Sequence, residues 1–161
     1  MTFSRQTVMF FATGGFVGNL PLAPGTFGSL IGLPICFFLT KLPAFVSAIL
    51  IGLFALAAVG IAGRAETMLN TKDPGCIVID EVAGQMVTLF GLPFNFPVVM
   101  GGFLAFRCLD IVKPFPIRWL ERRLSGGFGI VADDILAGLM ANIIIRCIII
   151  FFSINRHNLS G

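Results

Sequence analysis

Long apolar runs separated by short polar segments dominate the pattern of this chain. The clearest run, Ala44–Ala62, contains 19 residues and would form a helix about 28 Å long. That length nearly matches the roughly 30 Å hydrocarbon core of a bilayer. Ile135–Ile154 is a second run, of 20 residues. The pattern therefore predicts two membrane-spanning helices.

The remaining apolar segments are shorter or interrupted. Thr7–Val17 predicts a short embedded or amphipathic N-terminal helix. Gly28–Thr40 contains a proline and predicts a kinked helix, with Thr26 as its N-terminal cap. Ile79–Phe90 and Val98–Arg107 predict two helices of about ten residues, each too short to span alone. We expect this pair to be broken or re-entrant and covered by the longer helices.

Composition fits a membrane protein, because 57% of the 161 residues are hydrophobic and only 12% are charged. We predict one all-α domain over residues 1–161, a small polytopic membrane protein of about four to six helices. The net charge is +3, and basic residues gather between positions 107 and 123. Beside apolar sequence, such a basic segment suits anionic lipid headgroups on the cytoplasmic side rather than nucleic acid. The four cysteines are scattered, and we expect them to be free thiols.

Five of the eight carboxylates lie in three clusters, each at the edge of an apolar segment. The alternating direction of the predicted helices places all three clusters on one membrane face. Carboxylates beside membrane-depth sequence are costly unless they are paired or bound to a cation, and oxygen ligands select Mg²⁺ or a similar hard cation. A simple helix-capping role stays open for the first two. The candidate metal ligands are Asp80, Glu81, Asp110, Asp133 and Asp134.

A phosphate-binding region is predicted next to these acids. Arg107, Asp110 and Lys113 follow at helical spacing and form one row at a helix end. We expect the glycine-rich stretch around Gly127 to be a flexible loop whose backbone N–H groups approach phosphate oxygens, with the last helix starting near Asp133. The sequence contains no cysteine-phosphatase loop, DxD motif, paired histidines, GxSxG elbow or P-loop. With these motifs absent, the class of chemistry that the acidic and basic residues favour is metal-assisted phosphate chemistry.

Arg146, in the middle of the last apolar run, is unexpected at membrane depth. It either snorkels to the interface, pairs with another group or lines a contact between helices. The sequence leaves these alternatives open.

Four segments, in order across nearly the whole chain, resemble the bacterial phosphatidylglycerophosphatase A family. They are PGTFGSLIGLP at 24–34, IVIDEVAGQ at 77–85, FRCLDIVKPFPIRWLERR at 106–123 and GGFGIVADDILAG at 126–138. The resemblance implies a small helical protein of the bacterial inner membrane. It also implies Mg²⁺-dependent hydrolysis of phosphatidylglycerophosphate to phosphatidylglycerol and inorganic phosphate, a step of phospholipid biosynthesis.

The resemblance also assigns residues by position. The family's acidic positions match Asp80, Glu81, Asp110 and Asp134, with Asp133 beside the last; its basic positions match Arg107, Lys113 and Arg118; its first-motif hydroxyls match Thr26 and Ser29. We expect the acids to hold metal and the basic and hydroxyl groups to bind phosphate. Whether water or an aspartate attacks phosphorus is left open, and so is the oligomeric state.

Two rival functions come from other classes of protein. A small transporter or channel subunit would use its acids as an ion path and would distribute them through the membrane depth. A non-catalytic scaffold would bind anionic lipids through the basic segment alone. For such a scaffold, changing Asp80 and Asp134 to asparagine would leave function intact.

Overall fold

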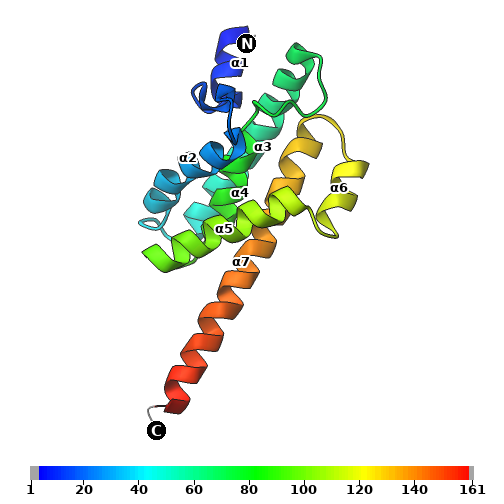
Figure 1. Ribbon diagram of the computed structural model, residues 1–161. Helices are drawn as coiled ribbons and strands as arrows, with labels where there is room; N and C mark the ends of the chain where they lie inside the picture. Colours follow the sequence, from blue (N-terminus) through cyan, green and yellow to red (C-terminus); the bar gives the residue numbers. More distant parts are fainter. Residues whose placement is uncertain (1–3, 160–161) are drawn as a thin grey trace.

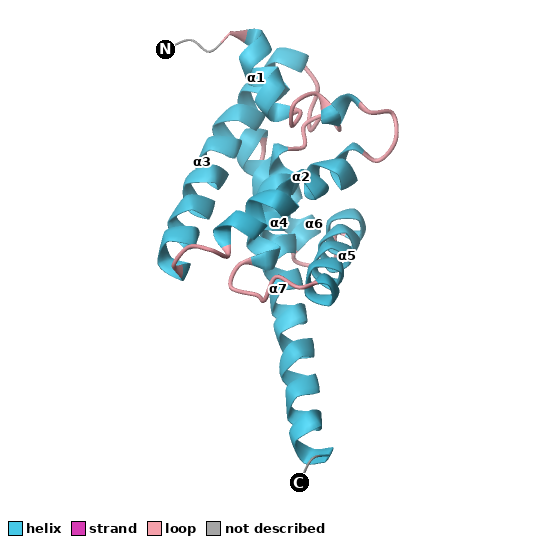
Figure 2. Cartoon of the chain, turned by 90° about the vertical axis from the view of Figure 1, so that its left-hand side faces the viewer, coloured by secondary structure: helices cyan, strands magenta, loops and turns pink. Residues whose placement is uncertain are grey.

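The computed structural model describes the backbone of residues 4–159 and the side chains of residues 4–155, and every regular element in that range is helical (Figures 1 and 2). The predicted all-α class is therefore confirmed. The described residues form seven α-helices, one more than the upper end of the expected four to six, because the basic segment forms a short helix of its own. The elements are α1 (Arg5–Ala12), the 3-10 turn η1 (Val17–Asn19), α2 (Pro24–Leu39), α3 (Ala44–Leu69), α4 (Ile79–Leu89), α5 (Phe96–Val112), α6 (Ile117–Arg123) and α7 (Gly126–Leu159).

Within the described residues, α3 and α7 are the two helices long and apolar enough to cross a membrane. Only 17% of the apolar window of α3 and 28% of that of α7 is buried inside the protein, so most of their side chains face outward. Together with their composition, this outward apolar surface indicates a membrane protein, as predicted. The 34 residues of α7 extend about 51 Å, and its C-terminal half continues beyond the other helices (Figure 2).

The short helix α4 lies at the centre of the bundle, where it packs against α2, α3, α5 and α7 (Figure 1). Nine of its 11 residues are buried. At about 16 Å, α4 cannot span a bilayer, and its polar backbone ends must be covered by protein. The prediction of a short helix enclosed by longer ones is therefore confirmed for α4.

Two side chains of α7 satisfy the carbonyl groups at the C-terminal end of α4. The Asn142 amide donates to the carbonyl oxygens of Val87, Thr88 and Phe90 at 3.3, 2.8 and 2.9 Å. Arg146 donates from Nη2 to the Phe90 oxygen at 2.8 Å and from Nε to Asn142 Oδ1 at 2.7 Å. Helix ends leave carbonyls unpaired and favour a nearby cation. The mid-helix arginine therefore pairs with the end of α4.

The predicted length of the second short helix, Val98–Arg107, is wrong. Helix α5 contains 17 residues and is about 25 Å long. Asn95 caps it by accepting a hydrogen bond from the Val98 N–H at 3.2 Å. Pro97 lies in the first turn, where its missing N–H removes no intrahelical bond. The proline that precedes the predicted helix thus belongs to the first turn of the observed one.

Two other predicted helix starts are also wrong. Helix α2 begins at Pro24, so Thr26 lies inside its first turn and does not cap it. Helix α7 begins at Gly126, so the expected glycine-rich loop is helical and Asp133 lies about two turns inside. A Cβ on Gly127 would overlap the Val59 carbonyl of α3. This glycine therefore permits close packing of two helices.

Candidate active site

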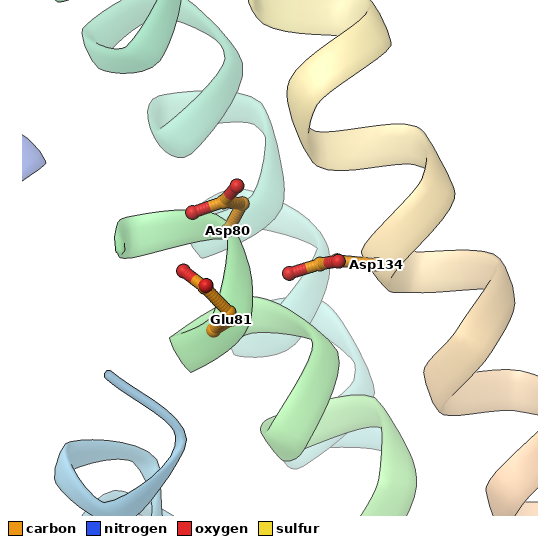
Figure 3. Close-up of side chains that lie close together, drawn as sticks. All are labelled: Asp80, Glu81 and Asp134. Atoms are coloured by element: carbon orange, nitrogen blue, oxygen red, sulfur yellow. The ribbon is translucent and has the colours of Figure 1, made fainter. Parts of the chain in front are cut away.

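Three carboxylates from two helices meet at one end of the bundle. Asp80 and Glu81 occupy the first turn of α4, and Asp134 lies about two turns into α7. One oxygen of each residue lies within 4.8 Å of the other two. Figure 3 shows Asp134 extending from α7 toward the two acids of α4. We call Asp80, Glu81 and Asp134 the carboxylate trio.

Close packing of α4 on α7 brings the trio together. Gly84 lies one turn after Asp80, and Gly138 lies one turn after Asp134. A Cβ on Gly138 would overlap the Gly84 carbonyl, and a Cβ on Gly84 would lie 2.5 Å from the ring of the buried Phe106. Only glycine permits both approaches, so this crossing sets the distance between the acid-bearing turns.

Two members of the trio are buried, the third, Glu81, is half-buried, and all three lack hydrogen-bond partners in the described part of the chain. Asp80 and Asp134 are 8% and 3% exposed. One buried oxygen of each trio residue has no hydrogen-bond partner among the described residues: Asp80 Oδ1, Glu81 Oε2 and Asp134 Oδ2. Buried carboxylates in this state are costly unless a cation compensates them. The trio therefore fits a metal ion that prefers oxygen ligands.

The acid strengths of the α4 pair point to the same need for positive charge. Burial raises the pKa of Asp80 well above its ordinary value, and repulsion from Glu81 adds to the effect. Burial also raises the pKa of Glu81 to about 7, although Asp80 and Arg107 act in the opposite direction. A bound cation favours the ionised forms of both groups and reverses this trend.

Arg107 on α5 connects the trio to a fourth acid. Its Nη1 lies 2.7 Å from Asp110 Oδ2 and 3.7 Å from Glu81 Oε1. The Arg107 Nε has no hydrogen-bond partner among the described residues. Gly25 makes this arrangement possible, because a Cβ there would overlap Glu81 Oε1. Asp110 thus lies next to the trio, paired with arginine, and not inside it.

Asp133 has a different environment from its neighbour in sequence. Lys113 Nζ donates to Asp133 Oδ2 at 2.5 Å and lies 3.1 Å from Glu121 Oε1. Consecutive residues of a helix point about 100° apart, and here the Asp133 side chain contacts Lys113 while that of Asp134 contacts the trio acids of α4. Burial alone would lower the pKa of Lys113, but its bonds to both acids raise that pKa. Asp133 therefore lies in an ion pair through Oδ2, and its other oxygen, Oδ1, is buried without a hydrogen-bond partner among the described residues.

The remaining predicted binding residues are spread over three regions. Ser29 is fully buried, and its hydroxyl donates to the Gly25 carbonyl of its own helix at 2.9 Å. Thr26 is partly buried next to Gly25, and its hydroxyl makes no hydrogen bond within the described part of the chain. Arg118 is exposed on α6, and Gly127 packs against α3. Of these four residues, only Thr26 combines a hydroxyl without a hydrogen-bond partner with a position next to Gly25, the glycine that approaches Glu81.

Gln85 was not among the predicted site residues. It is fully buried one turn after Glu81, and both polar atoms of its side chain lack a partner among the described residues. Its amide offers a donor and an acceptor to a ligand or water beside the trio. The signal was present in the sequence as a four-residue spacing from Glu81, which places both side chains on one face of α4.

These features define a helical membrane protein with a buried carboxylate site suited to a metal ion and an arginine beside it suited to an anion. The family model described as Phosphatidylglycerophosphatase A matches residues 10–149. The match spans most of the chain, which therefore belongs to this family.

Individual relatives agree with this family. A protein named Phosphatidylglycerophosphatase A from Escherichia coli strain K12 is 39% identical over 131 residues, which cover 81% of this chain and 76% of that protein. A protein of the same name from Haemophilus influenzae is 34% identical over 85% of each chain. A Bacteroides thetaiotaomicron relative, 36% identical over 83% of this chain and 87% of its own length, carries a provisional name as a phosphatidylinositol-3-phosphatase. No solved structure matches this chain significantly.

Proposed function

We propose that this chain is a phosphatidylglycerophosphatase, which hydrolyses phosphatidylglycerophosphate to phosphatidylglycerol and inorganic phosphate in phospholipid biosynthesis. Membership of the family supports this reaction. The observation that carries the chemistry is the carboxylate trio, which is buried at one end of an apolar helix bundle. The rival function, a transporter or channel subunit, would need acids distributed through the membrane depth. The charge in the middle of α7 is instead a base, Arg146, which pairs with the end of α4.

We assign Asp80, Glu81 and Asp134 as ligands of Mg²⁺. All three offer oxygen atoms, the ligand type that Mg²⁺ prefers, and each has an unpaired buried oxygen. When bound, the ion would polarise the phosphoryl oxygens and lower the pKa of a coordinated water. Each substrate phosphate brings further negative charge, so the protein needs cations of its own nearby.

Arg107 meets that need in the proposed site. Its guanidinium lies beside Glu81, and its unused N–H donors suit the non-bridging oxygens of the terminal phosphate. Asp110 holds Arg107 in this orientation through the 2.7 Å ion pair. The Thr26 hydroxyl, in the first turn of α2, offers a further donor at a helix N-terminus, where anions are favoured. Lys113 acts through Asp133 by holding α5 against α7.

The arrangement suits a substrate that never leaves the bilayer. The outward apolar faces of α3 and α7 can lie beside its acyl chains, while the trio, near the start of both α4 and α7, meets its headgroup. We place this end of the bundle at the cytoplasmic face of the inner membrane. The support is the basic helix α6, which packs against α7 and follows the tendency of positive segments to remain cytoplasmic.

Phosphate release by the purified protein tests the proposal. Activity on phosphatidylglycerophosphate should require Mg²⁺ and disappear with a chelator. Asp80→Asn should lower kcat/KM by more than the roughly 100-fold that loss of an outer-shell metal partner can cost. Asp73→Asn makes the same charge change at an exposed acid outside the trio and should remain close to the parent. Full activity of Asp80→Asn would refute the assigned site.

A further inference from the structure

A cavity lined by both basic and apolar side chains lies at the turn between α5 and α6, outside the carboxylate trio. Its volume is 480 Å³, and we call it the basic cavity. Helix α6 packs against α7, beside its first turns (Figure 1). The cavity is therefore at the same end of α7 as the trio. Its lining includes Val112, Lys113, Phe115, Arg118, Trp119 and Arg122.

The cations of the basic cavity are not balanced by acids. Lys113 is neutralised by Asp133 and Glu121. Neither Arg118 nor Arg122 has an acidic partner in the part of the chain that the structure describes. Two guanidinium groups therefore remain available, and guanidinium is suited to bidentate binding of phosphate oxygens.

The position of Arg118 is fixed by the protein backbone. Its Nη2 donates to the Val112 carbonyl at 3.0 Å, at the end of α5. One face of the arginine is thus held at the cavity wall, and its remaining N–H groups are free to bind a ligand. A pre-oriented donor loses less conformational entropy on binding than a mobile side chain.

The rim of the basic cavity is apolar and exposed. Phe115 is 81% exposed, Val112 is 55% exposed and Trp119 is 48% exposed, and all three line the cavity. Aromatic side chains next to basic ones are typical of the boundary between headgroups and acyl chains. A soluble anion would use the arginines but leave this rim in water. An anionic phospholipid satisfies both features, because its phosphodiester and its acyl chains are joined.

We infer that the basic cavity binds the phosphodiester headgroup of an anionic phospholipid that is not being hydrolysed. The phosphodiester lies between Arg118 and Arg122, and the upper part of the acyl chains contacts Phe115 and Trp119. Attraction of anionic lipid to basic residues near a membrane is worth about 1 kcal/mol each. That energy corresponds to about five-fold in affinity per arginine. The inference does not depend on the proposed reaction.

The only tryptophan of the chain provides a direct measurement, because Trp119 lines the cavity. The full chain is reconstituted in phosphatidylcholine vesicles without divalent cation or phosphatidylglycerophosphate. A fraction of the lipid is replaced by phosphatidylglycerol brominated near the headgroup end of its chains, or by phosphatidylcholine brominated identically. At equal mole fraction, the phosphatidylglycerol should quench Trp119 emission about five-fold more effectively or better.

Two variants on the same helix separate the cavity from the general surface charge. Arg122→Gln should reduce the preference for phosphatidylglycerol about five-fold. Arg123→Gln removes the same charge from a side chain that stacks over the Trp119 ring at 4.6 Å but does not line the cavity. It should keep the preference, with quenching normalised to its own unquenched emission. Circular dichroism of both variants checks that each is folded.

Three results would overturn the inference. Equal quenching by the two brominated lipids would show that the cavity does not select anionic lipid. An equal loss of preference in both variants would show attraction by diffuse charge instead of a cavity. Reversal of the quenching by millimolar inorganic phosphate would assign the arginines to a soluble anion. Because no substrate is present, each result is independent of the hydrolysis assay.

Discussion

Asp133 and Asp134 are neighbours on α7, yet they belong to regions with a different balance of charge. Asp133 bonds to Lys113, which also pairs with Glu121, so two carboxylates share one half-buried ammonium. Asp134 lies within 4.8 Å of two further carboxylates, of which only Glu81 has an arginine nearby, at 3.7 Å. The first region balances its own charge more closely, and the second has an excess of negative charge. A cation site is marked by that excess, and acidic residues alone do not define it.

The largest expected effect separates these two aspartates. Asp134→Asn should lower phosphatase activity by more than about 100-fold and abolish stabilisation by Mg²⁺. Asp133→Asn should retain the Mg²⁺-dependent rise in Tm, because Asp133 is not in the trio. For an intact site, Mg²⁺ at 100 times its Kd adds about 2.7 kcal/mol to the free energy of unfolding. Thermal unfolding with and without Mg²⁺ measures this difference. Equal loss of the rise in both variants would contradict the contrast between the two regions.

A smaller effect should follow from forcing apart the helices that form the trio. Gly138→Ala places a methyl group against the Gly84 carbonyl, so α7 must shift away from α4. Such overpacking costs about 1–3 kcal/mol of stability, and the shift should also weaken Mg²⁺ binding. Gly52→Ala is the matched control, because no atom lies within 4 Å of a Cβ on Gly52. Thermal unfolding and a Mg²⁺ titration compare the variants. A Gly138→Ala protein with unchanged Mg²⁺ affinity would show that this crossing does not set the geometry of the trio.

The smallest expected effect on activity concerns the far end of α4. Arg146→Met removes hydrogen bonds to Phe90 and Asn142 while keeping a long side chain. Loss of these bonds should reduce stability by about 1–3 kcal/mol and change activity much less than Asp134→Asn does. Ser153→Ala, which removes a hydrogen bond within α7 itself, should have little effect. Denaturant unfolding in detergent measures both. Equal stability of the Arg146 variant and the parent would show that the cap contributes nothing.

The sequence predicted the helices well where apolar length alone decides the outcome. Ala44–Ala62 and Ile135–Ile154 fall within α3 and α7, and Ile79–Phe90 covers α4. The starts of α2, α5 and α7 were misplaced, because the predicted helices began only after Pro24, Pro97 and Gly126. Proline in a first turn and glycine at a close helix contact are both compatible with helix. Local composition does not distinguish these uses from a break in the chain.

By itself, the sequence determined that two long apolar segments form helices and that acidic segments lie at their edges, since each residue's preference for lipid or water is a local property. Only the tertiary structure decided which acids meet. That outcome depends on the rotation and separation of packed helices, which Gly84 and Gly138 set by allowing α4 and α7 into contact. The same packing turned Asp134 toward Asp80 and left Asp133 to Lys113, a choice that spacing along one helix cannot make.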